Sequence, residues 1–482
     1  MNEAVRIRPW RPSQTKIVAT VGPACESETM LAQLVEAGVD VFRLNTAHGD
    51  QAQHQARLET IRRISRRLGQ PVAVLVDLAG PKIRLGELPG GQRQLAAGQT
   101  VRFVRANPRA PDELVTTYET LVDELAPGDR VMLADGTVSL VVESVGPGFA
   151  ACRVVQPGLV RSRQGVNLPG AKLRAAALGP TDRHFVHWAA QNQVDFLGLS
   201  FVRSAAEVLE LKALLAQWGA PTQVIAKIEK PEALECLEAI LDAADGVMVA
   251  RGDLGVEIDI AQVAVVQKRI VALCAQRHKP VIIATQMLDS MQHETLPTRA
   301  EVADVANAIL DGADACMLSG ETAIGQYPRQ AVEMMHRIAL ATEGVYPIPR
   351  AAEKPDSITA GVHEITEATA HAAAWLAAEV RAKLVVVATA SGRIALVLSK
   401  NRSRVPTVGV SDSETTLRRM CLYWGVIPLP GAPTADHAAL VQHITQWGKD
   451  RGVLAAGDRL VVLAGTGLAM TAHNMLVVHQ VD

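Results

Sequence analysis

Polar and charged residues stand directly after several apolar runs of the sequence, where buried strands would end. One run, VAVLV (72–76), is followed by Asp77, a Gly-Pro turn, Lys82 and Arg84. Six of eight such runs end in groups that bind anions or ligate metals: Arg43 and Asn45; Asp77, Lys82 and Arg84; Lys227 and Glu229; Arg251 and Asp253; Thr285 and Gln286; Ser319 and Glu321. One charged strand end is commonly a salt bridge or a cap, but six that converge indicate a functional site.

This mixture of side chains favours phosphoryl transfer on a small anionic substrate. Glu229 and Asp253, on neighbouring runs, offer oxygen ligands for a hard cation such as Mg2+. Arg43 and Lys227 add positive charge. The segment RGDLG (251–255) predicts a helix start, whose free N–H groups can bind a carboxylate or a phosphate. Cations, a divalent metal and an anion-binding helix start are the parts of a phosphoryl-transfer site.

The eight apolar runs, rich in Val, Ile, Leu and Ala, predict parallel strands that are buried on both faces. They lie at 15–22, 39–45, 71–77, 194–202, 222–229, 245–253, 279–287 and 313–321. Amphipathic segments between them predict helices. The repeat predicts a (β/α)8 TIM barrel over residues 15–85 and 169–345, with chemistry at the carboxyl ends of its strands.

Two stretches depart from this repeat. Residues 86–168 alternate between apolar and polar, and ADG (134–136) is a hairpin signal, so we predict an inserted all-β domain, a β-barrel lid over the site. After a linker-like segment, PRAAEKPDS (349–357), helix and strand patterns predict a C-terminal α/β domain with a mostly parallel sheet at 355–482. Residues 1–14 are expected to form an N-terminal tail.

The composition excludes several classes of protein. The 482 residues carry a net charge of −2 without a long block of like charge, which argues against a nucleic-acid or membrane-surface protein. No apolar run reaches the roughly 18–20 residues that span a bilayer. The N-terminus lacks an apolar signal core, and the six cysteines form no CxxC pair. We therefore expect a cytoplasmic protein with reduced thiols.

Several motifs, in this order, resemble those of pyruvate kinases, and the match covers nearly the whole chain. They are TKIVATVGPA, FRLNTAHG, GPKIR, QGVNLPGA, AKIEK, VARGDLGVEI, ATQMLDSM, the long segment 297–328, and LYWGV. The resemblance implies the same three domains and a Mg2+-dependent or Mn2+-dependent transfer of phosphoryl from phosphoenolpyruvate to ADP, giving pyruvate and ATP, the last step of glycolysis. It also implies a homotetramer with sugar-phosphate or nucleotide effectors.

The resemblance implies a role for each matching residue. Glu229 and Asp253 resemble the divalent-metal ligands, and Lys227 the lysine that stabilises the transferring phosphoryl and the enolate. The remaining matches are Arg43 for the substrate phosphate; Thr285 beside the methylene carbon; the backbone of Ala250, Arg251 and Gly252, with Asp253, for the carboxylate; Ser319 and Glu321 for enolate protonation; and Asn45, His48 and Arg84 for the nucleotide phosphates.

The chain also departs from the family pattern at contact positions. Gln164 replaces a lysine before GVNLPG, and the adjacent Arg163 is the candidate to replace that contact. The loop TASGRI resembles an effector phosphate loop, but Ile394 replaces its usual hydroxyl residue, so fructose 1,6-bisphosphate is not the expected ligand. The residues of that loop are Thr389, Ser391, Gly392 and Arg393.

The pattern around Lys82 predicts independence from K+. Many pyruvate kinases hold K+ with oxygens at the positions of Asn45, residue 47, Asp77 and the carbonyl of residue 78, and commonly carry glutamate at the position of Lys82. This chain has Ala47 and Leu78. We expect the Lys82 ammonium to replace K+, with Asp77 as its counter-charge. The alternative is a surface ion pair without a catalytic part.

Two other functions compete with an active pyruvate kinase. A diverged non-catalytic or weakly active paralogue is suggested by Ala47 and Gln164, although Lys227, Glu229, Asp253 and Thr285 are all retained. A metal-dependent pyruvate or phosphoenolpyruvate lyase could use the same barrel. The predicted lid and C-terminal domain favour the kinase over the lyase, because a lid suits a nucleotide substrate.

Overall fold

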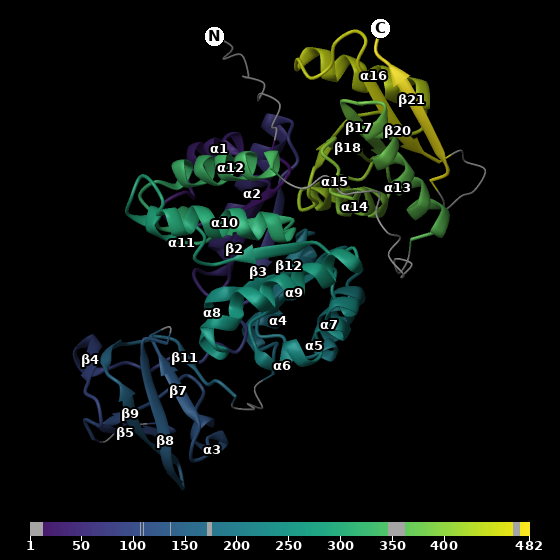
Figure 1. The fold of residues 1–482 in the computed structure, drawn as a ribbon. Coiled ribbons are helices and arrows are strands. Elements are labelled where there is room, and N and C mark those ends of the chain that lie inside the picture. The colour runs from purple at the N-terminus through teal and green to yellow at the C-terminus, as the bar shows by residue number, and fades with distance from the viewer. Residues whose placement is uncertain are drawn as a thin grey trace.

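The computed structural model describes residues 13–106, 108, 110–134, 136–170, 176–345, 362–465 and 473–482. Three units follow one another in space, with the lid below, the barrel in the middle and the C-terminal domain above (Figure 1). Most of the expected N-terminal tail and the linker at 349–357 lie outside the described residues. Ser13 and Gln14, expected in that tail, are buried, and Gln14 donates a hydrogen bond to the carbonyl of Arg404.

The eight predicted strands form one closed parallel barrel, which confirms the predicted fold. Neighbours in the barrel are β1-β2-β3-β12-β13-β14-β15-β16 and back to β1. Their bounds are β1 Lys16–Thr20, β2 Val41–Asn45, β3 Ala73–Asp77, β12 Phe196–Leu199, β13 Gln223–Ile228, β14 Gly246–Ala250, β15 Val281–Ala284 and β16 Ala315–Leu318. Because all eight run in the same direction, their carboxyl ends open at one mouth.

The barrel strands are mostly apolar because both of their faces are covered, and charged residues such as Arg43 in β2 and Lys227 in β13 are exceptions. Side chains such as Leu75, Phe196 and Met248 fill the interior, whereas Val74, Leu197 and Val249 pack under the surrounding helices. Those helices are α1 Glu28–Ala37, α2 Gln51–Leu68, α4 Pro180–Gln191, α5 Ala205–Gln217, α7 Leu237–Ala243, α9 Val263–Gln276, α10 Arg299–Asp311 and α12 Pro328–Gly344.

Short helices follow directly after three strands and place backbone N–H groups at the mouth. They are α6 Pro231–Glu235, α8 Arg251–Glu257 and α11 Gly320–Ala323, and the 3-10 turns η2 Ile260–Gln262 and η3 Asp289–Gln292 lie nearby. The helix α8 begins at Arg251 immediately after β14, as the sequence predicts. These helix starts can bind negatively charged groups of a substrate.

The inserted domain is all-β apart from the single turn of α3 Leu121–Glu124 and the 3-10 turn η1 Pro89–Gly91. Its strands are β4 Gln92–Leu95, β5 Thr100–Val104, β6 Glu113–Leu114, β7 Arg130–Leu133, β8 Val138–Gly146, β9 Phe149–Gln156, β10 Gly158–Arg161 and β11 Val166–Asn167. Among the described residues they form a six-stranded sheet and a separate β4–β10 pair. The segment 83–86 bridges the two edges of the six-stranded sheet, because it exchanges backbone hydrogen bonds with residues 115–117 beyond β6 and with residues 164–166 at β11, as a β-barrel requires.

The C-terminal domain has the predicted mostly parallel sheet, in the order β19-β18-β17-β20-β21, with β21 alone antiparallel. Its elements are α13 Glu364–Glu379, β17 Leu384–Ala388, α14 Arg393–Lys400, β18 Thr407–Val410, α15 Glu414–Met420, β19 Val426–Leu429, α16 His437–Asp450, β20 Arg459–Ala464 and β21 Met475–Gln480. No described helix is long and apolar enough to cross a membrane.

Buried ion pairs fix this domain to the amino end of the barrel, opposite the mouth. Asp314, just before β16, contacts Lys400 at 2.6 Å and Arg402 at 3.0 Å. Asp195, just before β12, contacts Arg418 at 2.6 Å. Both carboxylates are fully buried. The described residues of the C-terminal domain therefore lie away from the strand-end site of this chain.

Candidate active site

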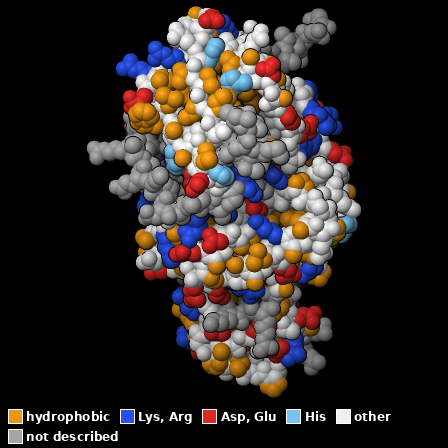
Figure 2. All heavy atoms as spheres, turned by 90° about the vertical axis from the view of Figure 1, so that its right-hand side faces the viewer, with side chains coloured by type: hydrophobic (Ala, Val, Ile, Leu, Met, Phe, Trp, Pro, Cys, Tyr) orange, Lys and Arg blue, Asp and Glu red, His pale blue; other side chains and the backbone are white. Residues whose placement is uncertain are grey.

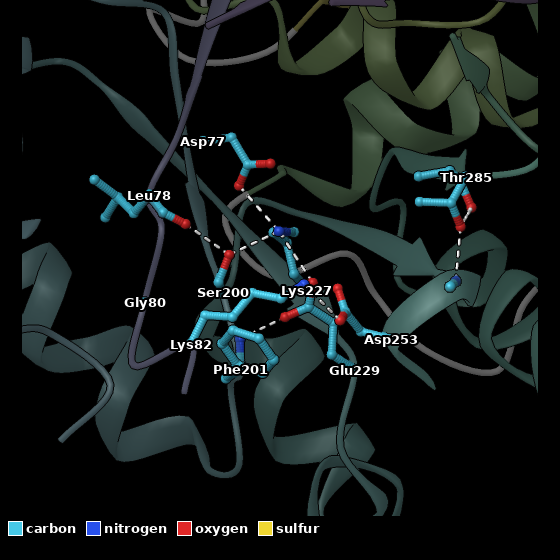
Figure 3. Close-up of polar contacts among 12 residues, drawn as sticks. Asp77, Leu78, Gly80, Lys82, Ser200, Phe201, Lys227, Glu229, Asp253 and Thr285 are labelled. Carbon is cyan, nitrogen blue, oxygen red and sulfur yellow. Dashed lines mark hydrogen bonds and ion pairs between the residues drawn. The ribbon is translucent and has the colours of Figure 1, made fainter. Parts of the chain in front are cut away.

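The mouth of the barrel brings together charged side chains from three neighbouring parts of the wall (Figure 3). Asp77 is the last residue of β3, Lys227 lies in β13, and Glu229 follows β13. Asp253 lies in the first turn of α8, directly after β14. These four side chains, which come from different strand ends, lie close together, as the sequence predicts.

Lys227 is the centre of this network. Its Nζ lies 3.1 Å from Asp77 Oδ1 and 3.0 Å from Glu229 Oε1, and it donates to Ser200 Oγ at 2.7 Å. Burial acts to lower the pKa of Lys227, but the two carboxylates outweigh it and raise the pKa above its usual value. The ammonium therefore stays charged in a buried position, ready to face an anionic substrate.

Asp77 is held by two cations, neither of which is Lys82. Arg43 contacts Asp77 Oδ2 through Nε at 2.7 Å and through a terminal nitrogen at 2.6 Å, while Lys227 contacts Oδ1. Burial acts to raise the pKa of Asp77, but Lys227 and Arg43 together lower it. Asp77 is therefore a buried anion that positions Arg43 and Lys227.

The prediction that Asp77 is the counter-charge of Lys82 is wrong. Lys82 Nζ instead lies 3.0 Å from Asp253 Oδ1. The Asp77 side chain points into the barrel beside Gly198, where an added Cβ would lie 2.9 Å from Asp77 Oδ1. Lys82 stands beyond the Gly-Pro turn, on the segment that leads to the lid, so its ammonium reaches α8 rather than the end of β3.

Ser200 and Phe201 belong to the site, and the sequence analysis missed them. Ser200 Oγ accepts a hydrogen bond from Lys227 and donates one to the Leu78 carbonyl at 2.7 Å. The Phe201 N–H donates to Glu229 Oε2 at 2.7 Å, from a backbone with φ of 55°. The signal available in the sequence was the polar Ser200 directly after the apolar run 194–199.

Glu229 and Asp253 fit a divalent cation that takes oxygen ligands. Glu229 is buried, and its Oε1 faces the Lys227 ammonium at 3.0 Å. Burial is the main cause that raises the pKa of Glu229, with Lys227 opposing it and Asp253 adding to it. The described residues contain no cluster of three or more metal-ligating side chains. Two carboxylates suit Mg2+ or Mn2+, which complete their shells with water and substrate oxygens.

The loop after β15 supports the start of α8. The Gly252 N–H donates to Thr285 Oγ1 at 2.7 Å, and Thr285 Oγ1 donates to the Ala284 carbonyl at 2.6 Å. Thr285 has a φ of 70°, an unfavourable backbone conformation for a β-branched residue that is typical of functional sites. The Arg251 guanidinium contacts Asp304, so only the backbone of Arg251 can serve a substrate.

A cavity of about 780 Å³ adjoins this network between the ends of β1, β2 and β16. Four of the predicted site residues line it: Arg43, Asn45, His48 and Ser319. Burial, together with Arg84, Arg43 and Lys82, lowers the pKa of His48. His48 is therefore neutral at physiological pH within a positive field, which suits the binding of phosphate groups.

Three further predicted residues, Glu321, Arg84 and Arg163, lie outside both this cavity and the network around Lys227. Glu321 is buried behind it, and its carboxylate accepts hydrogen bonds from the N–H groups of Leu288 and Ser319. Burial raises the pKa of Glu321. Arg163 is 79% exposed and contacts Glu87 in the lid domain. Arg84 donates to the Arg163 carbonyl, so these two arginines lie together at the connection between the barrel and the lid.

The predicted effector loop lies in the C-terminal domain. Gly392, with φ of 80°, precedes α14, and its N–H donates to Thr389 Oγ1 at 3.0 Å. The Arg393 N–H faces Ser391 Oγ at 3.4 Å. The loop therefore has the backbone of an anion-binding turn, and the helix that follows it ends at Lys400, which contacts Asp314 of the barrel.

Comparisons with known proteins agree along the chain. Residues 12–332 match the family model "pyruvate kinase, barrel domain", and residues 367–479 match "pyruvate kinase, alpha/beta domain". A pyruvate kinase of Sporosarcina psychrophila is 39% identical over 472 residues, which span 97% of this chain and 80% of that protein. A pyruvate kinase of Geobacillus stearothermophilus is 40% identical over 480 residues, with the same coverage.

A solved structure has the same overall fold. The crystal structure of a pyruvate kinase from Cryptosporidium parvum matches this chain with a TM-score of 0.90 at 32% sequence identity. The match covers 98% of this chain and 97% of the other.

Proposed function

This chain belongs to the pyruvate kinase family and transfers the phosphoryl group of phosphoenolpyruvate to ADP, and we propose that Lys82 replaces a monovalent cation in that reaction. The paralogue and lyase alternatives are not favoured, because relatives about 40% identical over nearly the full length are pyruvate kinases. The chain also keeps Lys227 and the carboxylates of Glu229 and Asp253 at the mouth. There Lys227 contacts Glu229, and Lys82 contacts Asp253.

The observation that carries independence from K+ is that the oxygens expected to hold that ion already have partners. Asp77 is taken by Arg43 and Lys227, and the Leu78 carbonyl accepts from Ser200. Asn45 Oδ1 accepts from the N–H of Ala47, a residue that offers no side-chain oxygen. A cation such as K+ needs several oxygens, so a tethered ammonium is the better source of positive charge here.

The reaction breaks the bond between phosphorus and the enolpyruvate oxygen and forms a bond to a terminal oxygen of ADP. We assign Lys227 and Arg43 to stabilise the charge on the transferring phosphoryl, and Lys227 also to stabilise the enolate oxygen. Glu229 and Asp253 would hold Mg2+ or Mn2+, which neutralises charge on the phosphoryl oxygens when bound. We assign Thr285 to the side of the enolate carbon that takes the proton, and Ser319 and Glu321 to the support of that step, because all three match the family pattern.

The remaining residues position the two substrates. The Ala250–Gly252 turn at the start of α8, with Asp253, would hold the substrate carboxylate. The nucleotide would enter the cavity of about 780 Å³ with its phosphates toward Asn45 and His48. Arg84 and Arg163 would reach those phosphates from the connection to the lid.

Steady-state rates in the presence and absence of K+ test the proposal. We expect full turnover with phosphoenolpyruvate, ADP and Mg2+ in K+-free buffer, with tetramethylammonium keeping the ionic strength constant. Lys82→Gln should be slow at any K+ concentration. Lys82→Glu should be slow and partly responsive to K+, and adding Ala47→Ser should increase that response. A several-fold stimulation of the unmodified enzyme by K+ would contradict the role of Lys82.

We also propose a cytoplasmic homotetramer. Figure 2 views the molecule from the right-hand side of Figure 1 and shows hydrophobic side chains gathered over the C-terminal domain at the top. Trp375 on α13 of that domain is 58% exposed, and on the barrel Val265 and Leu296 are 60% and 65% exposed. Exposed apolar side chains on two domains suit the two interfaces of a tetramer. Light scattering after size exclusion would measure the mass of the assembly.

A further inference from the structure

The ion pair between Lys82 and Asp253 places a cation on a proposed metal ligand. Lys82 Nζ lies 3.0 Å from Asp253 Oδ1, and the two side chains are 29% and 23% exposed. Asp253 lies in the first turn of α8, and Lys82 belongs to the segment between β3 and the lid. Figure 3 shows the Lys82 side chain reaching Asp253 beside Glu229. In this arrangement an ammonium stands at the carboxylate that a divalent cation would need.

Lys82 and Lys227 differ in how firmly they are held. Lys227 is buried and contacts Asp77, Glu229 and Ser200 at once. Lys82 has Asp253 as its one ion-pair partner among the described residues. Its side chain also lines a small cavity of about 40 Å³ at the joint between the lid and the barrel. Lys82 can therefore move away from its partner, whereas Lys227 cannot without breaking the network.

A metal ion and the Lys82 ammonium cannot both occupy this oxygen of Asp253. Mg2+ binds carboxylate oxygens at about 2.0–2.1 Å, which would bring a double positive charge close to the ammonium. The Coulomb energy between two unit charges about 4 Å apart is about 1 to 4 kcal/mol, depending on how strongly the solvent screens it. The repulsion is larger for a divalent ion. Of the two lysines that contact the proposed metal ligands, the more weakly held one, Lys82, therefore withdraws when the metal binds, whereas Lys227 stays with Asp77 and Ser200.

We propose that Lys82 occupies the divalent-metal position on Asp253 in the metal-free enzyme and leaves it when the metal binds. This inference rests on the proposed function in one respect, the assignment of Asp253 as a metal ligand. The metal then displaces the ammonium, which becomes available to the substrate phosphate only once the metal site is filled. The Lys82–Asp253 ion pair therefore lowers the affinity for the metal in the absence of substrate. By linkage, bound metal destabilises the ion pair by the same free energy.

The same exchange affects the connection to the lid. Arg84, two residues after Lys82, pairs with Gly165 where the chain returns from the lid. Lys82 and Asp253 therefore tie this two-stranded connection to α8. Release of Lys82 removes this tie, whereas the hydrogen bond from Asn167 of β11 to Glu257 of α8 remains.

The test is direct Mn2+ binding to the substrate-free enzyme, followed by electron paramagnetic resonance of free Mn2+ at constant ionic strength. Lys82→Met and Lys82→Gln should bind Mn2+ roughly three- to ten-fold more tightly than the unmodified enzyme, the factor expected for losing one partly exposed ion pair. Arg84→Met is the matched control, because it removes a nearby positive charge that does not contact Asp253. It should leave the affinity for Mn2+ within about two-fold.

Asp253→Asn separates failure of this inference from failure of the proposed metal site. If Asp253→Asn loses Mn2+ binding while both Lys82 variants bind like the unmodified enzyme, the displacement of Lys82 is wrong and the metal site stands. If Asp253→Asn binds Mn2+ normally, the metal site itself is wrong, and the inference falls with it. Circular dichroism of each variant shows whether the fold is intact.

Discussion

Lys227 combines the greatest burial with the most charged contacts of any cation at the mouth. It lies between Asp77 and Glu229, and its pKa is raised despite burial. Removing one partner of a buried ion pair leaves uncompensated charge, which commonly costs about 3–5 kcal/mol. Lys227 therefore matters for stability as well as for charge stabilisation in the transition state, and experiments on it must measure both.

We predict that Lys227→Met lowers turnover by roughly two or more orders of magnitude, the scale for loss of one electrostatic stabiliser. The measurement is the rate of pyruvate release from phosphoenolpyruvate, ADP and Mg2+, with circular dichroism to show that the protein is folded. Lys212→Met is the control, because Lys212 pairs with Asp245 at the opposite end of the barrel. Near-normal turnover of folded Lys227→Met would remove Lys227 from the mechanism.

The two carboxylates make a separate prediction about the metal. Glu229→Gln and Asp253→Asn should each abolish activity at ordinary Mg2+ concentrations, because each removes a charged oxygen ligand. Raising the Mg2+ or Mn2+ concentration should restore part of the activity, since the other carboxylate remains. Titrating activity against metal concentration measures this shift. Full activity of the unmodified enzyme in EDTA would rule out the site.

At the scale of elements, the start of a short helix is the recurring device of this protein. The helix α8 begins at Arg251, immediately after β14, and carries Asp253, while α11 begins at Gly320, with Ser319 alone between it and the end of β16. The same arrangement occurs in the C-terminal domain, where α14 follows the Gly392 turn. In each case the strand fixes the position of the helix start, so the N–H groups point in a defined direction.

We predict that the loop before α14 binds a sugar-phosphate or nucleotide effector, and that Arg393→Ala weakens the response. The reason is that the Arg393 side chain adds positive charge at the N-terminal end of a helix. The measurement is the dependence of the rate on phosphoenolpyruvate concentration with a panel of sugar phosphates and nucleotides. Arg381→Ala, an exposed arginine of the same domain, is the control. If Arg393→Ala changes no effector response, the effector site lies elsewhere.

At the scale of the whole molecule, the C-terminal domain is joined to the barrel by buried charges rather than by an apolar surface alone. Lys400 is buried against Asp314, and Arg418 is largely buried against Asp195. His278 of the barrel lies at the same interface, 4.0 Å from Glu367 of α13. Such an interface depends on the protonation states of its groups.

We predict that His278 makes this molecule less stable in acid. Burial lowers the pKa of His278 to about 4, with Glu367 opposing the shift and Lys400 and His371 adding to it. The unfolded state takes up a proton near pH 6.5 and the folded state only near pH 4. Stability from this group is therefore complete above pH 6.5 and falls as the pH drops toward 4, by up to about 3 kcal/mol.

Denaturant unfolding at several pH values checks this prediction. The free energy of unfolding of His278→Gln should fall less steeply between pH 6.5 and 4 than that of the unmodified protein, because Gln does not titrate. Carboxylates elsewhere contribute equally to both proteins, so the difference between the two curves isolates His278. Parallel curves over this range would show that His278 does not control the acid sensitivity.

The sequence by itself determined the barrel and the order of the three domains. The strands of the barrel are covered on both faces, so most of their residues are apolar, as in VAVLV (72–76), which is a local signal. The placement of Arg43, Lys227 and Asp253 at one mouth follows, because parallel strands end at the same side. No knowledge of contacts was needed for these conclusions.

Only the tertiary structure decided which charges meet. Asp77 and Lys82 are five residues apart, yet Asp77 contacts Arg43 and Lys227, and Lys82 contacts Asp253. Strand register sets the neighbours of Asp77, and the turn after β3 carries Lys82 toward α8. The tertiary structure also places Ser200 in the site, since its hydroxyl lies between Lys227 and the Leu78 carbonyl. Ion pairing depends on distances of a few ångströms between distant segments, which sequence spacing does not encode.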